Sequence, residues 1–198
     1  MDLKDLWKYP DKVINEFVDK RIHFLKLFTL FAADGIVQFY YFFRLMNKKP
    51  YENLSQLFAT IITLLIFGTL YGIFYNLIFG GLIKITGKFF NKKVSLKQIY
   101  KALSISYYPM IVGVFIVISL FLTGHLILNN QSSSIFIYAI LLILLKLLLA
   151  FILFWRLVLL IKSLRIVMRT NYQIAIIMYL SGITFFILIY LIVNSLIV

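Results

Sequence analysis

The residues of this 198-residue chain that are suited to acid–base or metal chemistry are few. All seven acidic residues fall within the first 52 positions, and only Asp34 lies inside a long apolar stretch. A paired-carboxylate hydrolase needs one acid to donate a proton and another to accept it, and a magnesium site needs several oxygen ligands. The chain has two histidines, His23 and His125, and no cysteine. We therefore expect no enzyme active site, no bound metal and no cofactor.

The side chains that most resemble a functional site are Asp34 and Lys146, each near the middle of an apolar stretch. A lone charge at the centre of a bilayer costs about 2.5 to 3.5 kcal/mol on insertion scales, and pairing offsets that cost. We predict that Asp34 contacts Lys146 inside the protein and that Gln38 extends this contact. The pair is either a proton or ion relay or a neutralised polar lock between helices. We favour the lock, because one pair lacks the chain of acceptors that a conduit needs.

The elements that hold these residues are predicted to be membrane-spanning helices. Hydrophobic residues make up 63% of the chain and charged residues 14%, against roughly 45–50% and about 25% in soluble domains. Several apolar stretches reach the length of about 20 residues that a helix needs to cross a hydrocarbon core of about 30 Å. The predicted fold class is an all-α integral membrane protein whose domain, residues 24–198, has five transmembrane helices. The predicted spans are residues 24–43, 57–83, 104–123, 135–161 and 173–197.

Residues 1–23 are predicted to form a separate amphipathic helix on the cytoplasmic side. Apolar side chains recur there at steps of three and four, with charged side chains on the opposite face. The helix lies either on the membrane surface or against the protein's own cytoplasmic face. Because this segment mixes acids with bases, we expect no cleavable signal.

The positive charges indicate the orientation. They gather in the N-terminal segment and in the second and fourth connections, whereas the first connection has only Arg44, Lys48 and Lys49. Since Lys and Arg resist translocation, we predict a plasma-membrane protein with a cytoplasmic N-terminus and an external C-terminus. We expect the cations behind the net charge of +13 to bind anionic phospholipids or a protein partner, and not nucleic acid. Each cation near an anionic leaflet contributes about 1 kcal/mol of attraction. The predicted headgroup- or partner-binding cations are Lys88, Lys92, Lys93, Lys97, Arg156, Lys162, Arg165 and Arg169.

Two short patterns predict helix starts. Ser95 with Gln98, and Thr170 with Gln173, each fit a capping box, in which two side chains satisfy unpaired backbone amides. The first predicts a helix that begins directly after Ser95 and ends or kinks near Pro109. The second predicts the start of the fifth span.

Four glycines in the second span predict a close helix–helix approach. Gly68 and Gly72 form a G-x-x-x-G pattern, and Gly80 is followed by Gly81. Small residues let two helix backbones come close together in membranes. We expect this face to pack within the protein, with a homo-oligomer contact as the alternative.

The segment Leu82–Gly113, LIKITGKFFNKKVSLKQIYKALSISYYPMIVG, resembles the Yip family, named for interaction with Ypt/Rab GTPases in membrane trafficking. In that family a long second span ends in glycine, and a short basic loop leads to an S-x-x-Q helix. A Y-x-x-x-P-like entry to the third span follows. Here Gly87, Ser95, Gln98 and Pro109 hold those places.

Two flanking pieces agree with this resemblance. LWKYPDKVINEFVDKR is similar to the family's opening P-x-x-x-F helix, and WRLVLLIKSLRIVMRTNYQIAIIMYL to its fourth span, basic turn and fifth span, with Ala175 at a small position. The resemblance implies a five-span, non-enzymatic membrane protein with a cytoplasmic N-terminus. The short N-terminal segment argues against direct GTPase binding. It makes the chain resemble the prokaryotic members of the family. We therefore predict a protein that organises membrane or recruits partners through basic loops, with a small transporter or channel subunit as the alternative.

Overall fold

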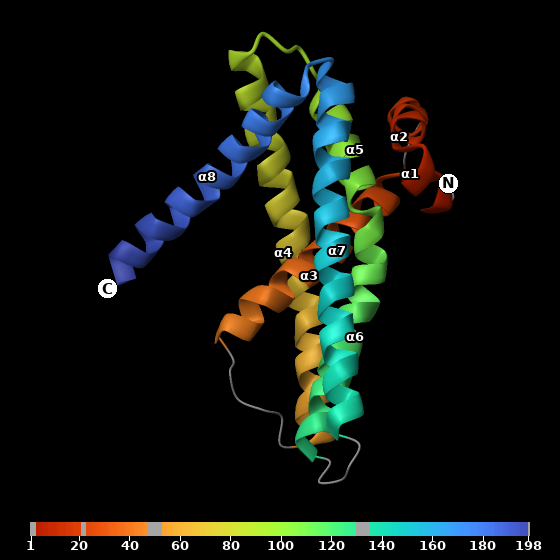
Figure 1. The fold of residues 1–198 in the computed structure, drawn as a ribbon. Coiled ribbons are helices and arrows are strands. Elements are labelled where there is room, and N and C mark those ends of the chain that lie inside the picture. The colour runs from red at the N-terminus through yellow and green to blue at the C-terminus, as the bar shows by residue number, and fades with distance from the viewer. Residues whose placement is uncertain (1–2, 21–22, 47–52, 130–134, 198) are drawn as a thin grey trace. The chain divides into compact units, whose positions relative to one another are not determined.

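The computed structural model describes residues 3–20, 23–46, 53–129 and 135–197, and all regular structure within them is α-helical (Figure 1). Each of the five predicted spans coincides with a helix or, for the third, with a pair of helices. Lys48 and Lys49, counted in the predicted first connection, lie outside the described residues. The helices are α1 (Leu3–Lys8), α2 (Pro10–Asp19), α3 (Phe24–Met46), α4 (Leu54–Phe89), α5 (Leu96–Ser106), α6 (Tyr108–Asn129), α7 (Ile135–Met168) and α8 (Tyr172–Ile197).

Three helices have the length and apolar composition needed to cross a membrane. Among the described residues these segments are Leu54–Phe89, Tyr108–Ile127 and Phe136–Met168. The apolar segment found in α8, Tyr172–Phe185, is shorter, and α3 is not among the three. The structure thus establishes an all-helical protein with three candidate spans, while the predicted total of five is not established by these criteria.

The N-terminal segment forms two helices rather than the predicted single one. Proline disfavours helical backbone at the residue before it, and Tyr9, which precedes Pro10, has φ −134° and ψ 58°. The chain therefore breaks between α1 and α2.

The first predicted capping box is confirmed. The Gln98 backbone N–H donates to Ser95 Oγ at 3.3 Å, and the Ser95 backbone N–H donates to Gln98 Oε1 at 3.2 Å. The helix begins at Leu96 and ends at Ser106. Pro109 cannot donate a backbone hydrogen bond, and its ring disfavours a continuous helix, so α6 begins separately at Tyr108.

The second predicted capping box is wrong, because Thr170 serves the preceding helix. The Thr170 N–H donates to the Arg165 carbonyl at 3.1 Å, and Arg169 has a positive φ of 47°. This is the pattern that closes the C-terminus of a helix, here α7. The cap of α8 is Asn171, whose Oδ1 accepts from the Ile174 N–H at 2.9 Å.

The chain divides into two compact units. Unit 1 comprises residues 1–23, 76–106 and 158–198, and unit 2 comprises residues 24–75 and 107–157. In unit 1, α2 packs against α5. The buried face of α2 consists of Val13, Ile14 and Phe17. Of the two placements left open for this amphipathic helix, the structure has the one in which its apolar face packs on the protein itself.

In unit 2, α3 packs against α6 and passes close to α4. The core of unit 2 consists of apolar side chains that are no more than 1% exposed, among them Phe31, Val37, Leu64, Val117 and Phe121. This packing fixes the rotation of α3 about its axis, and therefore the direction in which its single acid points.

Candidate functional site

Unit 2 contains a buried ion pair between Asp34 of α3 and Arg156 of α7. Arg156 Nε lies 2.8 Å from Asp34 Oδ1, and Arg156 Nη2 donates to Oδ2 at 3.2 Å. The side chains are 0% and 13% exposed, for Asp34 and Arg156 respectively. Gln38, one turn along α3, donates from Nε2 to Asp34 Oδ2 at 2.6 Å. Arg156 thus donates one hydrogen bond, to Oδ2, while its Nε forms a close ion-pair contact with Oδ1 that lacks hydrogen-bond geometry.

Aromatic rings complete this polar cluster. The guanidinium carbon of Arg156 lies 4.9 Å from the centre of the Tyr107 ring, within cation–π range. Phe31 meets the same ring edge-on, with 6.0 Å between the ring centres. Tyr107 and Phe31 are both 0% exposed. The charges therefore neutralise each other in a nearly dry site.

The predicted contact between Asp34 and Lys146 is wrong, and so is the placing of Arg156 among the headgroup-binding cations. The partner that the structure gives Asp34 is Arg156, ten residues beyond Lys146 on α7, or about 15 Å along a helix. The position of Lys146 along its predicted span suggested it as the partner of Asp34. That position does not indicate which face of α7 meets α3, so the wrong cation was chosen. Gln38 does bind Asp34, as predicted, but it extends the pair with Arg156 rather than one with Lys146.

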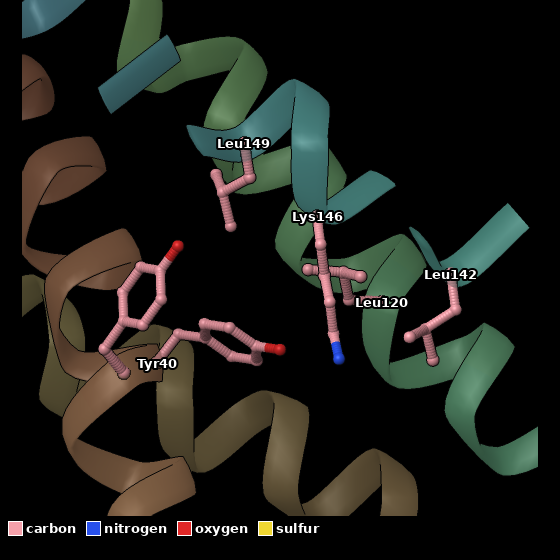
Figure 2. Close-up of a pocket in the computed structure, with 6 residues that line it drawn as sticks. Tyr40, Leu120, Leu142, Lys146 and Leu149 are labelled. Atoms are coloured by element: carbon pink, nitrogen blue, oxygen red, sulfur yellow. The ribbon is translucent and has the colours of Figure 1, made fainter. Parts of the chain in front are cut away.

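Lys146 lines a separate cavity of about 480 Å³ in unit 2. Figure 2 shows its side chain reaching from α7 into this space. The other lining residues are Tyr40, Tyr41, Leu120, Leu142 and Leu149.

The G-x-x-x-G glycines of α4 are used for packing within the protein. A Cβ atom on Gly68 would lie 2.7 Å from Ile36 Cα, and one on Gly72 would lie 2.6 Å from Gly35 Cα. Both distances are too short for real carbon atoms. The predicted intramolecular packing is therefore confirmed at these two positions.

Gly80 and Gly81 differ in how closely other residues approach them. In unit 1, the Tyr100 ring covers Gly80 so closely that a Cβ there would clash with it. Around Gly81 a Cβ would meet no described atom within 4 Å. The packing prediction thus holds for Gly80 and is wrong for Gly81 within the described chain.

Two of the predicted headgroup-binding cations hold the N-terminal helix pair. Lys162 Nζ lies 3.1 Å from Asp11 Oδ1, and Arg165 Nη2 lies 2.9 Å from Asp11 Oδ2. Asp11 belongs to α2 and its side chain is 47% exposed. In the same unit, Lys92 Nζ donates to the Arg169 carbonyl at 3.2 Å, which caps the end of α7. Together with Arg156, four of the eight predicted cations therefore have structural partners.

The remaining cations of that prediction form an exposed group, which we term the basic end. It consists of Lys88, Lys93, Lys97 and Arg169. All four belong to unit 1 and follow or flank the C-terminal ends of α4 and α7 or the start of α5.

A comparison with protein families identifies the chain. The model of the Yip1 domain matches residues 4–194. The chain belongs to the Yip1 domain family. This confirms the resemblance drawn from the sequence, and with the apolar helices it makes the chain a multi-pass membrane protein. No curated protein and no solved structure matches it.

The match places every feature described above inside the Yip1 domain. It begins within α1 and ends within α8, so it includes the N-terminal helix pair, the Asp34 cluster and the basic end. Across the described part of this Yip1 domain, no three His, Asp or Glu side chains lie together as metal ligands would. His23 is exposed in unit 1, and His125 is 8% exposed on α6 in unit 2.

Two residues of the Yip1 domain that matter to the packing were missed in the sequence. Gly35 meets Gly72 where α3 and α4 cross, and no pattern within α3 marks it. Lys101 is 8% exposed and donates from Nζ to the carbonyls of Val18 and, at 2.7 Å, of Lys20. It therefore satisfies the carbonyls at the end of α2.

The surroundings of Lys101 also change its acidity. Burial first, and then the nearby Lys97 charge, lower the pKa of Lys101 below its ordinary value, while Asp19 acts in the opposite direction. Its place on the buried face of the amphipathic α5 is the signal that marks it in the sequence.

Proposed function

We propose that this Yip1-family protein is a non-enzymatic, five-span protein of the plasma membrane. It organises the surrounding membrane or recruits a partner through its basic end on the cytoplasmic side. The observation that carries this proposal is the exposure of Lys88, Lys93, Lys97 and Arg169, because other cations of the same unit are engaged by Asp11 and by a helix end. Exposed cations beside an anionic leaflet each contribute about 1 kcal/mol of attraction.

The buried ion pair supports the five-span arrangement. In α3, Asp34 is neutralised by Arg156 and further hydrogen-bonded by Gln38, so the cost of placing its carboxylate in the hydrocarbon is largely removed. The helix of 26 residues at α8 is long enough, at about 1.5 Å per residue, to cross a core of about 30 Å. With α4, α6 and α7, these two helices make five.

The same pair supports a structural role for the intramembrane charges. Asp34 is fully buried and held by two side chains, and Arg156 also rests on an aromatic ring. A proton relay requires an acid that exchanges protons with a pathway. We infer that the cluster locks α3 to α7, and we do not favour a transporter.

Anionic phospholipid and an acidic protein surface are the two kinds of partner that the basic end fits. Both present negative oxygen atoms, which pair with Lys and Arg through charge-assisted hydrogen bonds. Two or more copies of this chain could assemble while the basic end binds lipid or an acidic protein.

The test is crosslinking in native membranes followed by identification of the captured proteins and lipids. The variant replaces Lys88, Lys93, Lys97 and Arg169 with glutamine. We expect it to lose a soluble partner or an anionic-lipid shell that the wild type retains. The control replaces Lys8 and Lys12 with glutamine and should capture what the wild type captures. Identical capture by all three proteins would rule out a role for the basic end.

A further inference from the structure

The cavity around Lys146 combines a positive charge with hydroxyl groups and an apolar wall. Lys146 enters it from α7 and Tyr40 lines it from α3 (Figure 2). Tyr41, the next residue of α3, also lines it. Leu142 and Leu149 flank Lys146 on its own helix, one turn before and one turn after, and Leu120 comes from α6. An ammonium group and two phenol hydroxyls are hydrogen-bond donors, and the leucines suit a hydrocarbon chain.

Lys146 lacks the compensation that Arg156 has. Within the described residues it forms no hydrogen bond or ion pair, and its side chain is exposed to the cavity side of α7. A lysine in a membrane-spanning helix is unfavourable unless an anion or water meets its ammonium group. The cavity volume of about 480 Å³ falls in the range of ligand sites, which span roughly 300 to 1,000 Å³.

The position of Lys146 along α7 indicates how deep its side chain lies in the membrane. Lys162 follows it by sixteen residues, or about 24 Å of helical rise. If Lys162 marks the cytoplasmic edge of a core about 30 Å thick, Lys146 begins about 6 Å inside the opposite edge. A lysine side chain can extend across that distance toward the headgroup level.

We propose that this cavity binds an anionic amphiphile, with the acidic headgroup on Lys146 and the two tyrosine hydroxyls and the acyl chain along the leucines. The headgroup is a phosphate of a membrane phospholipid or a carboxylate of a free fatty acid. Both carry negative oxygen atoms attached to a hydrocarbon chain. The cavity is built from other residues than the basic end, because its lining belongs to unit 2 and the basic end to unit 1.

The test measures lipid binding to the purified full-length protein by native mass spectrometry. The probes are phosphatidylglycerol, oleate and phosphatidylcholine, each titrated separately. We expect the wild type to bind an anionic probe more tightly than phosphatidylcholine, and Lys146→Gln to weaken that binding about tenfold, as expected for loss of a charged hydrogen bond. Lys146→Arg, which keeps the charge, should restore it. Lys12→Gln is the matched control, since it removes one exposed lysine that belongs neither to the cavity nor to the basic end.

The outcomes separate the two sources and can refute the site. Weakened binding of phosphatidylglycerol alone identifies a phospholipid, weakened binding of oleate alone identifies a free acid, and weakening of both identifies a site for either. Thermal unfolding in detergent must show that Lys146→Gln is folded. If Lys146→Gln binds both anionic probes as the wild type does, or if the wild type binds neither, the proposal is wrong. None of these results depends on partner capture at the basic end.

Discussion

The Asp34 carboxylate shows how burial turns one ion pair into a requirement of the fold. Its 0% exposure removes water as an alternative partner, so the two oxygens depend on Arg156 and Gln38. Removing one member of a buried pair leaves an uncompensated charge, whereas replacing both costs much less. The pair therefore specifies which helices meet, more than it adds net stability.

Substitution of this pair is expected to show strong coupling. Asp34→Asn or Arg156→Gln alone should destabilise the protein by about 3 to 5 kcal/mol, because each leaves a buried charge without its counterion. The double variant should lose less than the sum of the two single variants. Unfolding in detergent micelles measures all three, and Lys146→Gln serves as a control that leaves the pair intact. Strictly additive losses would show that the two side chains do not interact.

At the scale of elements, pairs of helices meet at glycine residues or at ion pairs of opposite charge. The backbones of α3 and α4 approach at Gly35, Gly68 and Gly72. In unit 1, α2 is held by buried apolar side chains, by Lys101 at its C-terminal carbonyls and by the pairing of Asp11 with α7. The two contacts differ in strength, since the glycine crossing is buried and the Asp11 pair is half exposed.

The glycine crossing predicts a sharp difference between two alanine variants of α4. Gly72→Ala places a carbon against the Gly35 backbone, which cannot move aside easily. We expect a loss of about 1 to 3 kcal/mol from overpacking. Gly81→Ala meets no described atom within 4 Å and should leave stability unchanged or slightly raised, because alanine favours helix. Equal melting temperatures for the two variants would contradict the crossing.

The docking of α2 predicts a smaller, local effect. Asp11→Asn removes both ion pairs to Lys162 and Arg165. Because the pairs are partly exposed, the loss should be about 1 kcal/mol or less, with faster amide hydrogen exchange confined to residues 3–20. Glu16→Gln, on an exposed position of the same helix, should leave exchange in that segment unchanged. Unchanged exchange in Asp11→Asn as well would show that apolar contacts alone hold the helix.

At the scale of the whole molecule, the charges are distributed unevenly along the chain. Acids occur only in the first 52 residues, whereas Lys and Arg gather at the C-terminal ends of α4 and α7 and in the connection after α4. Such a bias orients multi-pass proteins with the positive connections in the cytoplasm. The proposed orientation follows from this bias and is independent of how the helices pack.

The orientation is testable by single cysteines, since the natural chain contains none. We expect Ser133→Cys, in the third connection, to react with a membrane-impermeant maleimide in intact cells. Val94→Cys, in the second connection, should react only after permeabilisation. The parent chain supplies the unlabelled control. Labelling of Val94→Cys from outside intact cells would overturn the orientation and the proposed cytoplasmic role of the basic end.

The sequence by itself determined the helical class, the approximate positions of the long apolar helices, the first capping box and the family. These depend on local patterns, namely runs of apolar residues, turn chemistry and short motifs. The tertiary structure alone decided that Asp34 pairs with Arg156, that a Cβ at Gly81 would meet no described atom, that Thr170 closes α7, and that α2 packs on α5. The physical reason is that a span in the sequence fixes a residue's approximate depth, while its partner depends on the rotation and crossing of two helices, which only side-chain packing sets.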